Sequence, residues 1–215
     1  MRIICIVIII VSSAVSSYGQ QDVKAKAIIH NFSTRAKEYK TIRTDFVFSM
    51  IDTRENTHED YEGTISVKEE KFRIDMLDTE TYFDGKTIWN FLVDVQEVNI
   101  TEPDEEDEFF LAAPYKIFSP DENEFKFNFI SETHIDNVPV YEIDLFPRNL
   151  NQEYARIRLQ INKTNMTLCS VKYFRKDGIH YNIKLSNFET NLNLPDSYFT
   201  FNIEDHPDVE VIDLR

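Results

Sequence analysis

The sequence contains few glycines, and they lie far apart. Only four of its 215 residues are glycine, and Gly63, Gly85 and Gly178 are the ones beyond the amino-terminal segment. Phosphate-binding loops and dinucleotide-binding turns need several glycines close together, because the backbone must approach the phosphates. A Gly-x-Ser-x-Gly nucleophile elbow is also absent. These absences exclude nucleotide-binding enzymes built on such loops and hydrolases built on the elbow.

Residues that could bind a metal are also sparse. The five histidines are scattered, and none has a partner at the spacing of a zinc site. The acidic run from Glu102 to Glu108 could attract calcium, but it lacks the spaced ligands and turn glycine of an EF-hand loop. A solvated helix start is the preferred interpretation of this run. We expect no metal, no cofactor and no catalytic residue, although triads assembled from distant positions keep an enzyme open as an alternative.

Cysteine and positive charge are in short supply. Cys5 and Cys169 are the two cysteines, and Cys169 lies in the apolar stretch from Leu168 to Phe174. We expect a buried, inert thiol there, with a reactive thiol as the alternative. Lysine and arginine number 23 against 38 aspartates and glutamates, which gives a formal net charge of −15. Such acidity argues against nucleic acid and anionic membrane surfaces as partners.

The one long hydrophobic run lies at the amino terminus and is too short to span a bilayer. Arg2 precedes it, residues 3–11 form the run, and Ser17 and Gly19 supply small residues before Gln20. This is the pattern of a secretory signal peptide over residues 1–19. No cysteine stands at the expected cut, so we expect no lipid anchor. No linker divides residues 20–215, which we expect to form a single domain.

Helical spacing is confined to two segments. Ile28, Phe32, Ala36 and Tyr39 recur at spacings of four, four and three residues, which predicts an amphipathic helix near the start of the domain. The second segment interrupts the strand patterns between Thr101 and Pro120. Its acidic residues come first and its aromatic residues last, which predicts a short amphipathic helix ended or kinked at Pro114.

Most of the remaining chain alternates between apolar and polar residues. This period of two recurs in roughly ten segments separated by short polar turns such as Asp136-Asn137 and Asp177-Gly178. Such repetition predicts a mainly β fold, an antiparallel meander with one apolar and one wet face, closed or partly closed. A sheet of this size can enclose one apolar ligand, but periodicity does not distinguish a filled core from a cavity.

Two motifs carry a resemblance to a known family. Residues 82–89 read Tyr-Phe-Asp-Gly-Lys-Thr-Ile-Trp, which resembles the Asp-Gly-Lys-Thr-aliphatic-Trp hairpin of the LolA family, the periplasmic carriers of outer-membrane lipoproteins. The ending, Phe-Thr-Phe at 199–201 and Val-Glu-Val-Ile-Asp at 209–213, is similar to that family's ending. The order of signal peptide, helix, three strands, hairpin, second helix and further strands also agrees. The resemblance covers essentially all of residues 20–215.

The resemblance implies an antiparallel half-open β-barrel, with the amino-terminal helix and the short second helix as a lid over an apolar cavity. It implies no catalysis and no cofactor. It implies a monomeric periplasmic chaperone that receives acylated lipoproteins from an ATP-driven inner-membrane complex and passes them to an outer-membrane acceptor or membrane. The residues expected to bind the acyl chains are Phe46, Phe48, Met50, Ile65, Val67, Phe72, Ile74, Met76, Trp89, Phe91, Phe109, Phe110, Leu111, Phe127, Ile143 and Leu159.

One position departs from the family. Well-known members carry an arginine after the Val-Lys of a strand, where it keeps the lid closed and acts in release. The matching stretch here is Ser-Val-Lys-Glu-Glu at 66–70, so Glu69 stands in place of the arginine. The closing contact must be made differently, with Lys68 or Lys71 as a possible substitute.

Three other interpretations of the protein's function remain open from the sequence. A carrier of the same fold that acts as an outer-membrane acceptor would need a lipidated cysteine at the cut, which is absent. An exported enzyme acting on lipids or glycans would have its site dispersed over the loops. A non-catalytic structural envelope protein would have no ligand.

Overall fold

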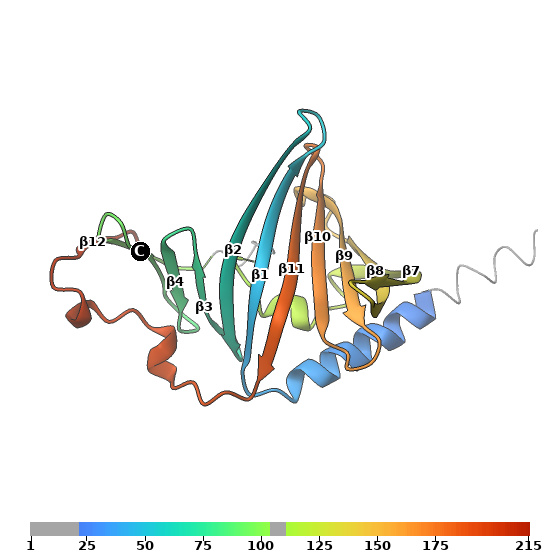
Figure 1. Ribbon diagram of the computed structural model, residues 1–215, viewed down its shortest axis with the longest axis horizontal. Coiled ribbons are helices and arrows are strands. Elements are labelled where there is room, and N and C mark those ends of the chain that lie inside the picture. The colour runs from blue at the N-terminus through green and yellow to red at the C-terminus, as the bar shows by residue number, and fades with distance from the viewer. Residues whose placement is uncertain (1–21, 104–110) are drawn as a thin grey trace, which may run out of the picture.

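The computed structural model describes residues 22–103 and 111–215 (Figure 1). The expected signal peptide therefore lies outside the described residues, and so do residues 104–110 of the expected lid helix, which include Phe109 and Phe110. The domain boundaries stay a prediction.

The fold is mainly β, as the alternation predicts. Within residues 22–103 and 111–215, twelve strands form one sheet, which is antiparallel except for a single parallel pair at one edge. In chain order they are β1 (Ile42–Asp52), β2 (Thr57–Lys68), β3 (Lys71–Met76), β4 (Thr79–Phe83), β5 (Ile88–Leu92), β6 (Glu97–Thr101), β7 (Phe125–Ile135), β8 (Val138–Pro147), β9 (Tyr154–Asn162), β10 (Leu168–Arg175), β11 (Ile179–Thr190) and β12 (Glu210–Asp213).

Two meanders meet in the middle of this sheet. β1 to β6 form the first and β7 to β11 the second, and the pairing of β1 with β11 joins them. The sheet ends at β7 on one side and at β12 on the other, so it does not close on itself. Figure 1 shows the resulting twisted, open sheet, with the long neighbouring strands β2, β1 and β11 at its centre. The expectation of a half-open antiparallel barrel is confirmed.

One face of the sheet, here called the inner face, packs against the amino-terminal helix. The chain is helical over residues 22–37, where Ile28 and Phe32 are buried and Ala36 packs against the same core. This is the stripe that the helical spacing predicts. Each strand contributes alternate residues to the inner face, and these residues lie opposite one another on neighbouring strands. Phe46 opposes Leu185, and Ile65 opposes Ile74. The shared period of two places all these side chains on one face.

The connection after β6 also covers the inner face. Ala113, Ile117 and Phe118 are buried there, the last two in η1 (Lys116–Phe118). The Phe118 ring lies 6.3 Å from Phe32 of the helix, and the Tyr115 ring stacks 6.5 Å from Phe83. Residues 111–118 and the helix together close much of the inner face.

The carboxyl-terminal segment crosses the opposite, outer face. It follows β11 through η2 (Asp196–Phe199) and η3 (Ile203–Asp205) to β12, which pairs in parallel with β6 (Figure 1). Phe201 packs there with Tyr82, Phe91 and Val98 in a second apolar cluster, separate from the inner core. This segment, called the strap below, comprises residues 191–213.

Of two turns with hairpin-type dipeptides, Asp136-Asn137 and Asp84-Gly85, the first forms a two-residue hairpin and the second does not. Asp136 and Asn137 both have positive φ, and Ile135 pairs with Val138, which makes a two-residue hairpin. The Asp84-Gly85 turn is not the two-residue hairpin that its dipeptide predicts. Residues 84–87 form a four-residue loop in which only Gly85 has positive φ and the Asp84 carboxylate accepts hydrogen bonds from the Lys86 and Thr87 amides.

Candidate functional site

A cavity opens where the helix ends beside the β2–β3 turn. Its volume is about 740 Å³, within the range of ligand sites. Ile42 and Val67 from the sheet and Phe118 from η1 form its buried apolar lining, and Tyr39 and Tyr115 add half-buried rings. The cavity therefore has an apolar floor provided by three separate parts of the chain.

The rim of this cavity is charged. Lys37, Glu38 and Lys40 come from the end of the helix, and Glu69 and Glu70 come from the turn between β2 and β3. All five are exposed. An apolar floor under a charged rim suits a ligand with an apolar body and a polar head that stays in water.

A second, smaller cavity lies on the other side of Tyr115. Its volume is about 330 Å³, and Phe72, Phe83 and Ile88 line it from the sheet. Ala113 and Tyr115 line it from the connection after β6, and Tyr115 and Glu70 are shared with the larger cavity. The Tyr115 ring, which stacks on Phe83, therefore contributes to the walls of both spaces.

Most of the residues expected to bind acyl chains lie on the inner face. Eight are buried in the inner core, three are half-buried against it, and Met50 is half-buried in the same row as Phe48. The buried ones are Phe46, Ile65, Val67, Phe72, Ile74, Phe127, Ile143 and Leu159, and the three packed against them are Phe48, Met76 and Leu111. Val67 lines the larger cavity and Phe72 lines the smaller one, while most of the other residues fill the core.

The expected facing of the hairpin is wrong. Trp89 and Phe91 belong to the outer cluster with Tyr82 and Phe201, whereas Ile88 packs with the inner core. The pairing of Phe83 with Ile88 and of Tyr82 with Trp89 fixes this arrangement. Apolar residues on both faces of β5 made the facing ambiguous, and the strap decided it by covering the outer face.

Several lining residues were missing from the sequence prediction. Tyr39, Ile42, Phe83, Tyr115 and Phe118 line the two cavities but are absent from the expected acyl-binding set. Tyr39 ends the helical stripe and Ile42 begins β1, so the periodicity could have identified both. Tyr115 and Phe118 lie in a segment without strong periodicity, where only the tertiary structure reveals their position.

Lys68 and Lys71, the two substitutes considered for the family's arginine, both contact the strap. Both ammonium groups lie 2.7 Å from the Asp196 carboxylate of the strap, and Lys68 also donates to the Leu194 carbonyl at 3.0 Å. Hydrogen bonds from these lysines lower the pKa of Asp196 to about 2. Both lysines therefore fasten the strap to the outer face. Glu69 has a positive φ of 56° and lies exposed at the cavity rim.

Among residues 22–103 and 111–215, no group of three histidines, cysteines or carboxylates could hold a metal ion. Cys169 is half-buried, and burial raises the pKa of its thiol, which disfavours the reactive thiolate.

No helix within residues 22–103 and 111–215 is long and apolar enough to cross a membrane. The part of the acidic run from residue 104 onward lies outside these ranges.

Comparison with solved structures supports the architecture. An uncharacterized conserved protein from Thermus thermophilus superposes with a TM-score of 0.60 at 12% identity, covering 88% of this chain and 99% of that one. MucB from the Pseudomonas aeruginosa MucA/MucB complex gives a TM-score of 0.51 at 12% identity, covering 84% and 62%. At these identities the likeness shows the fold alone.

Comparison by sequence shows the family. No curated protein sequence is significantly similar to the chain. The family model described as outer membrane lipoprotein carrier protein LolA matches residues 37–202, which span β1 to the Phe-Thr-Phe of the strap. The chain therefore belongs to the LolA family, and its open sheet with one amino-terminal helix is a LolA-like fold.

Proposed function

We propose that this protein is an exported carrier of acylated lipoproteins that shields their acyl chains on the inner face of its sheet. The observation that carries the proposal is the cavity of about 740 Å³, with its apolar floor and charged rim, in a member of the LolA family. Acyl chains would lie against Ile42, Val67 and Phe118, and the lipoprotein's polar amino-terminal region would stay at the rim.

The cavity suits transient binding. Each buried CH₂ group contributes roughly 0.8 kcal/mol, so complete burial of several acyl chains would make release very slow. Residues 111–118 also cover this floor. Their regular structure, within the described part of the chain, is the single turn of η1. Docking of Tyr115 against Phe83 competes with the ligand for apolar surface of the sheet, which moderates affinity.

The carrier's partners follow from this chemistry. A lipoprotein embedded by its acyl chains must be extracted with energy, so we propose an ATP-driven inner-membrane complex as the donor. The recipient would be an outer-membrane acceptor or the membrane itself. The transfer would occur in the periplasm, after removal of residues 1–19, with the carrier acting as a monomer without catalysis.

The direct test uses lipoprotein release. Purified protein is added to spheroplasts that contain a labelled lipoprotein, and the soluble fraction is analysed for a one-to-one complex. We expect release above that seen with a non-binding control protein. Absence of any release would contradict the carrier function.

A matched pair of variants tests the site. Phe118 is 7% exposed at the cavity, and Phe201 is 5% exposed in the outer cluster. Phe118→Ser should weaken acyl binding about tenfold or more, because roughly 1.5–3 kcal/mol of burial is lost at the floor. Phe201→Ser should destabilise the fold and leave acyl affinity unchanged. Equal effects of both variants on affinity would contradict this site.

A further inference from the structure

The first half of β2, residues 57–62, has a free edge. β3 ends at Met76 opposite Gly63, so only residues 63–68 of β2 pair with β3. Residues 57–62 pair with β1, and no second strand pairs with them within the described part of the chain. Figure 1 shows β1 and β2 extending well beyond β3 and β4. Five of these six residues are exposed, and Tyr61 is half-buried. Their outward backbone groups are available to another strand.

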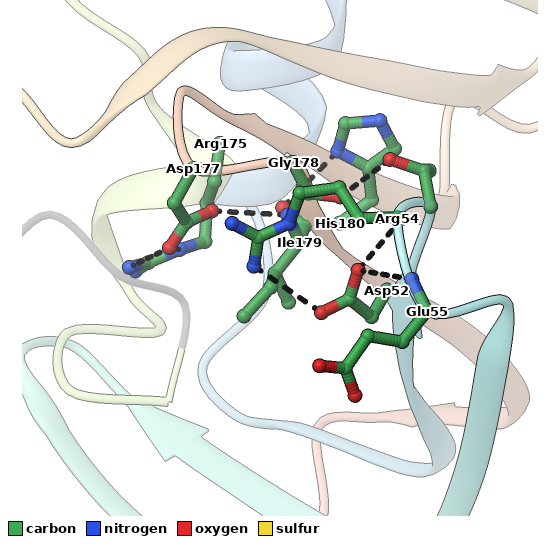
Figure 2. Close-up of polar contacts among 9 residues, drawn as sticks. Asp52, Arg54, Glu55, Arg175, Asp177, Gly178, Ile179 and His180 are labelled. Atoms are coloured by element: carbon green, nitrogen blue, oxygen red, sulfur yellow. Dashed lines mark hydrogen bonds and ion pairs between the residues drawn. The ribbon is translucent and has the colours of Figure 1, made fainter.

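This edge is held in place from its other side. β1 pairs with β11 as far as Asp52 and Ile179, and the tips of the β1–β2 and β10–β11 hairpins are joined. Thr53 donates to the Gly178 carbonyl through its amide at 3.2 Å and its hydroxyl at 2.8 Å. Figure 2 shows this junction, in which the Asp52 carboxylate also accepts from the Arg54 amide at 2.8 Å. An incoming strand would therefore meet an ordered template.

The side chains along the edge carry negative charge and point to both faces. Asp60 and Glu62 lie on the outer face, and Glu59 and Tyr61 lie on the inner face, since Tyr61 opposes Phe48. The Tyr61 ring stacks 6.3 Å from Phe48, which in turn lies 5.4 Å from Tyr181. The outer row is His58, Asp60 and Glu62, with His58 Nε2 2.8 Å from the Asp60 carboxylate, and on the inner row the Tyr61 hydroxyl donates to Glu59.

Charge decides which strand can pair here. A second copy would bring its own acidic edge against Asp60 and Glu62, and like charges placed opposite each other destabilise a strand pair. A basic segment would face those carboxylates favourably, and the formal net charge of −15 would attract it over a longer range.

We propose that residues 57–62 of β2 bind an extended basic segment of a partner protein by β-strand addition. Main-chain hydrogen bonds would supply affinity, and alternate side chains would supply specificity. Lysine or arginine would lie beside Asp60 and Glu62, and an apolar residue would lie beside Tyr61. This surface is separate from the acyl cavity, so the inference does not depend on the proposed function.

The test uses a fluorescein-labelled peptide in which lysine and valine alternate, titrated with the full protein and followed by fluorescence anisotropy. We expect saturable binding and slower hydrogen exchange of the amides of residues 57–62. A peptide of the same sequence with all of its backbone amides methylated cannot donate main-chain hydrogen bonds to the edge and should not bind. Equal binding of the methylated peptide, unchanged exchange at residues 57–62, or no binding at all would overturn the proposal.

Charge-reversal variants give the matched comparison. Asp60→Lys with Glu62→Lys should weaken peptide binding about tenfold, since two attractive surface pairs become repulsive. Glu204→Lys with Asp205→Lys changes the net charge equally at exposed positions of η3 and should leave binding nearly unchanged. Equal weakening by both pairs would show non-specific attraction and overturn the site. A stable dimer of the unmodified protein protected at residues 57–62 would assign the edge to a second copy and also overturn it.

Discussion

The inner and outer faces of the sheet both bury aromatic rings, but different interactions hold them. The inner face is mostly apolar and is covered by the helix and residues 111–118. The outer face is largely polar. Its buried parts are the strap cluster around Phe201 and an ion network in which Arg156 and Arg158 contact Asp144. The comparison shows that one sheet uses hydrophobic packing on one side and paired charges on the other.

The largest effect should come from the inner face. Phe32 is 1% exposed between the helix and Phe118, and Phe32→Ala should lower the free energy of unfolding by about 3–5 kcal/mol. The measurement is urea unfolding followed by circular dichroism. Val23→Ala on the same helix, at a side chain 68% exposed, should change stability little. Similar losses in both variants would show that helix propensity, and not inner-face packing, dominates.

The outer face should depend on its charges almost as strongly. Asp144 is 3% exposed and accepts hydrogen bonds from Arg158 at 2.6 and 3.0 Å and from Arg156 at 3.0 Å. Asp144→Ala should cost about 2–3 kcal/mol, because two partly buried guanidinium groups lose their acceptor.

The control for Asp144 is the exposed pair of Glu153 and Arg175, whose Glu153 side chain is 75% exposed. Glu153→Ala should cost well under about 1 kcal/mol, as water screens such pairs. A loss at Asp144 no greater than that at Glu153 would contradict the role given to the outer network.

A smaller effect should follow from crowding the inner face. A Cβ atom at Gly63 would lie 2.6 Å from the Phe46 ring and 2.8 Å from the Asp75 carbonyl. Gly63→Ala should therefore destabilise by about 1–3 kcal/mol through overpacking. A double-mutant cycle with Phe46→Leu checks the cause, since the smaller side chain should relieve part of the cost. Strict additivity in that cycle would show that the Phe46 ring is not responsible.

The smallest effect concerns the strap at low pH. Hydrogen bonds from Lys68 and Lys71 lower the pKa of Asp196 to about 2. The ionised carboxylate therefore adds stability that is complete above its ordinary pKa of about 3.9 and is lost as the pH falls toward 2.

Asp196→Asn should be slightly less stable than the unmodified protein at pH 5, and the difference should disappear near pH 2. Thermal unfolding across this range measures it. Lys71→Met should reduce the same pH dependence. A constant difference between Asp196→Asn and the unmodified protein at every pH would refute the linkage.

Sequence reasoning succeeded where one periodic pattern had one interpretation. The stripe of Ile28, Phe32 and Ala36 predicted the helix and its buried side, and the alternation in β1, β2 and β3 predicted the inner-face residues. It failed where both faces of a strand are apolar, as in β5, and where side chains pair across long separations, as Lys68 and Lys71 do with Asp196.

The sequence by itself determined the mainly β class, the helix, the inner-face pattern and the family resemblance, because these depend on local spacing and short motifs. Only the tertiary structure decided the course of the strap, the outward facing of Trp89, the free edge of β2 and the cavity floor at Tyr115 and Phe118. The physical reason is that period-two alternation specifies which residues share a face. Which segment then covers that face depends on contacts between residues far apart in the chain.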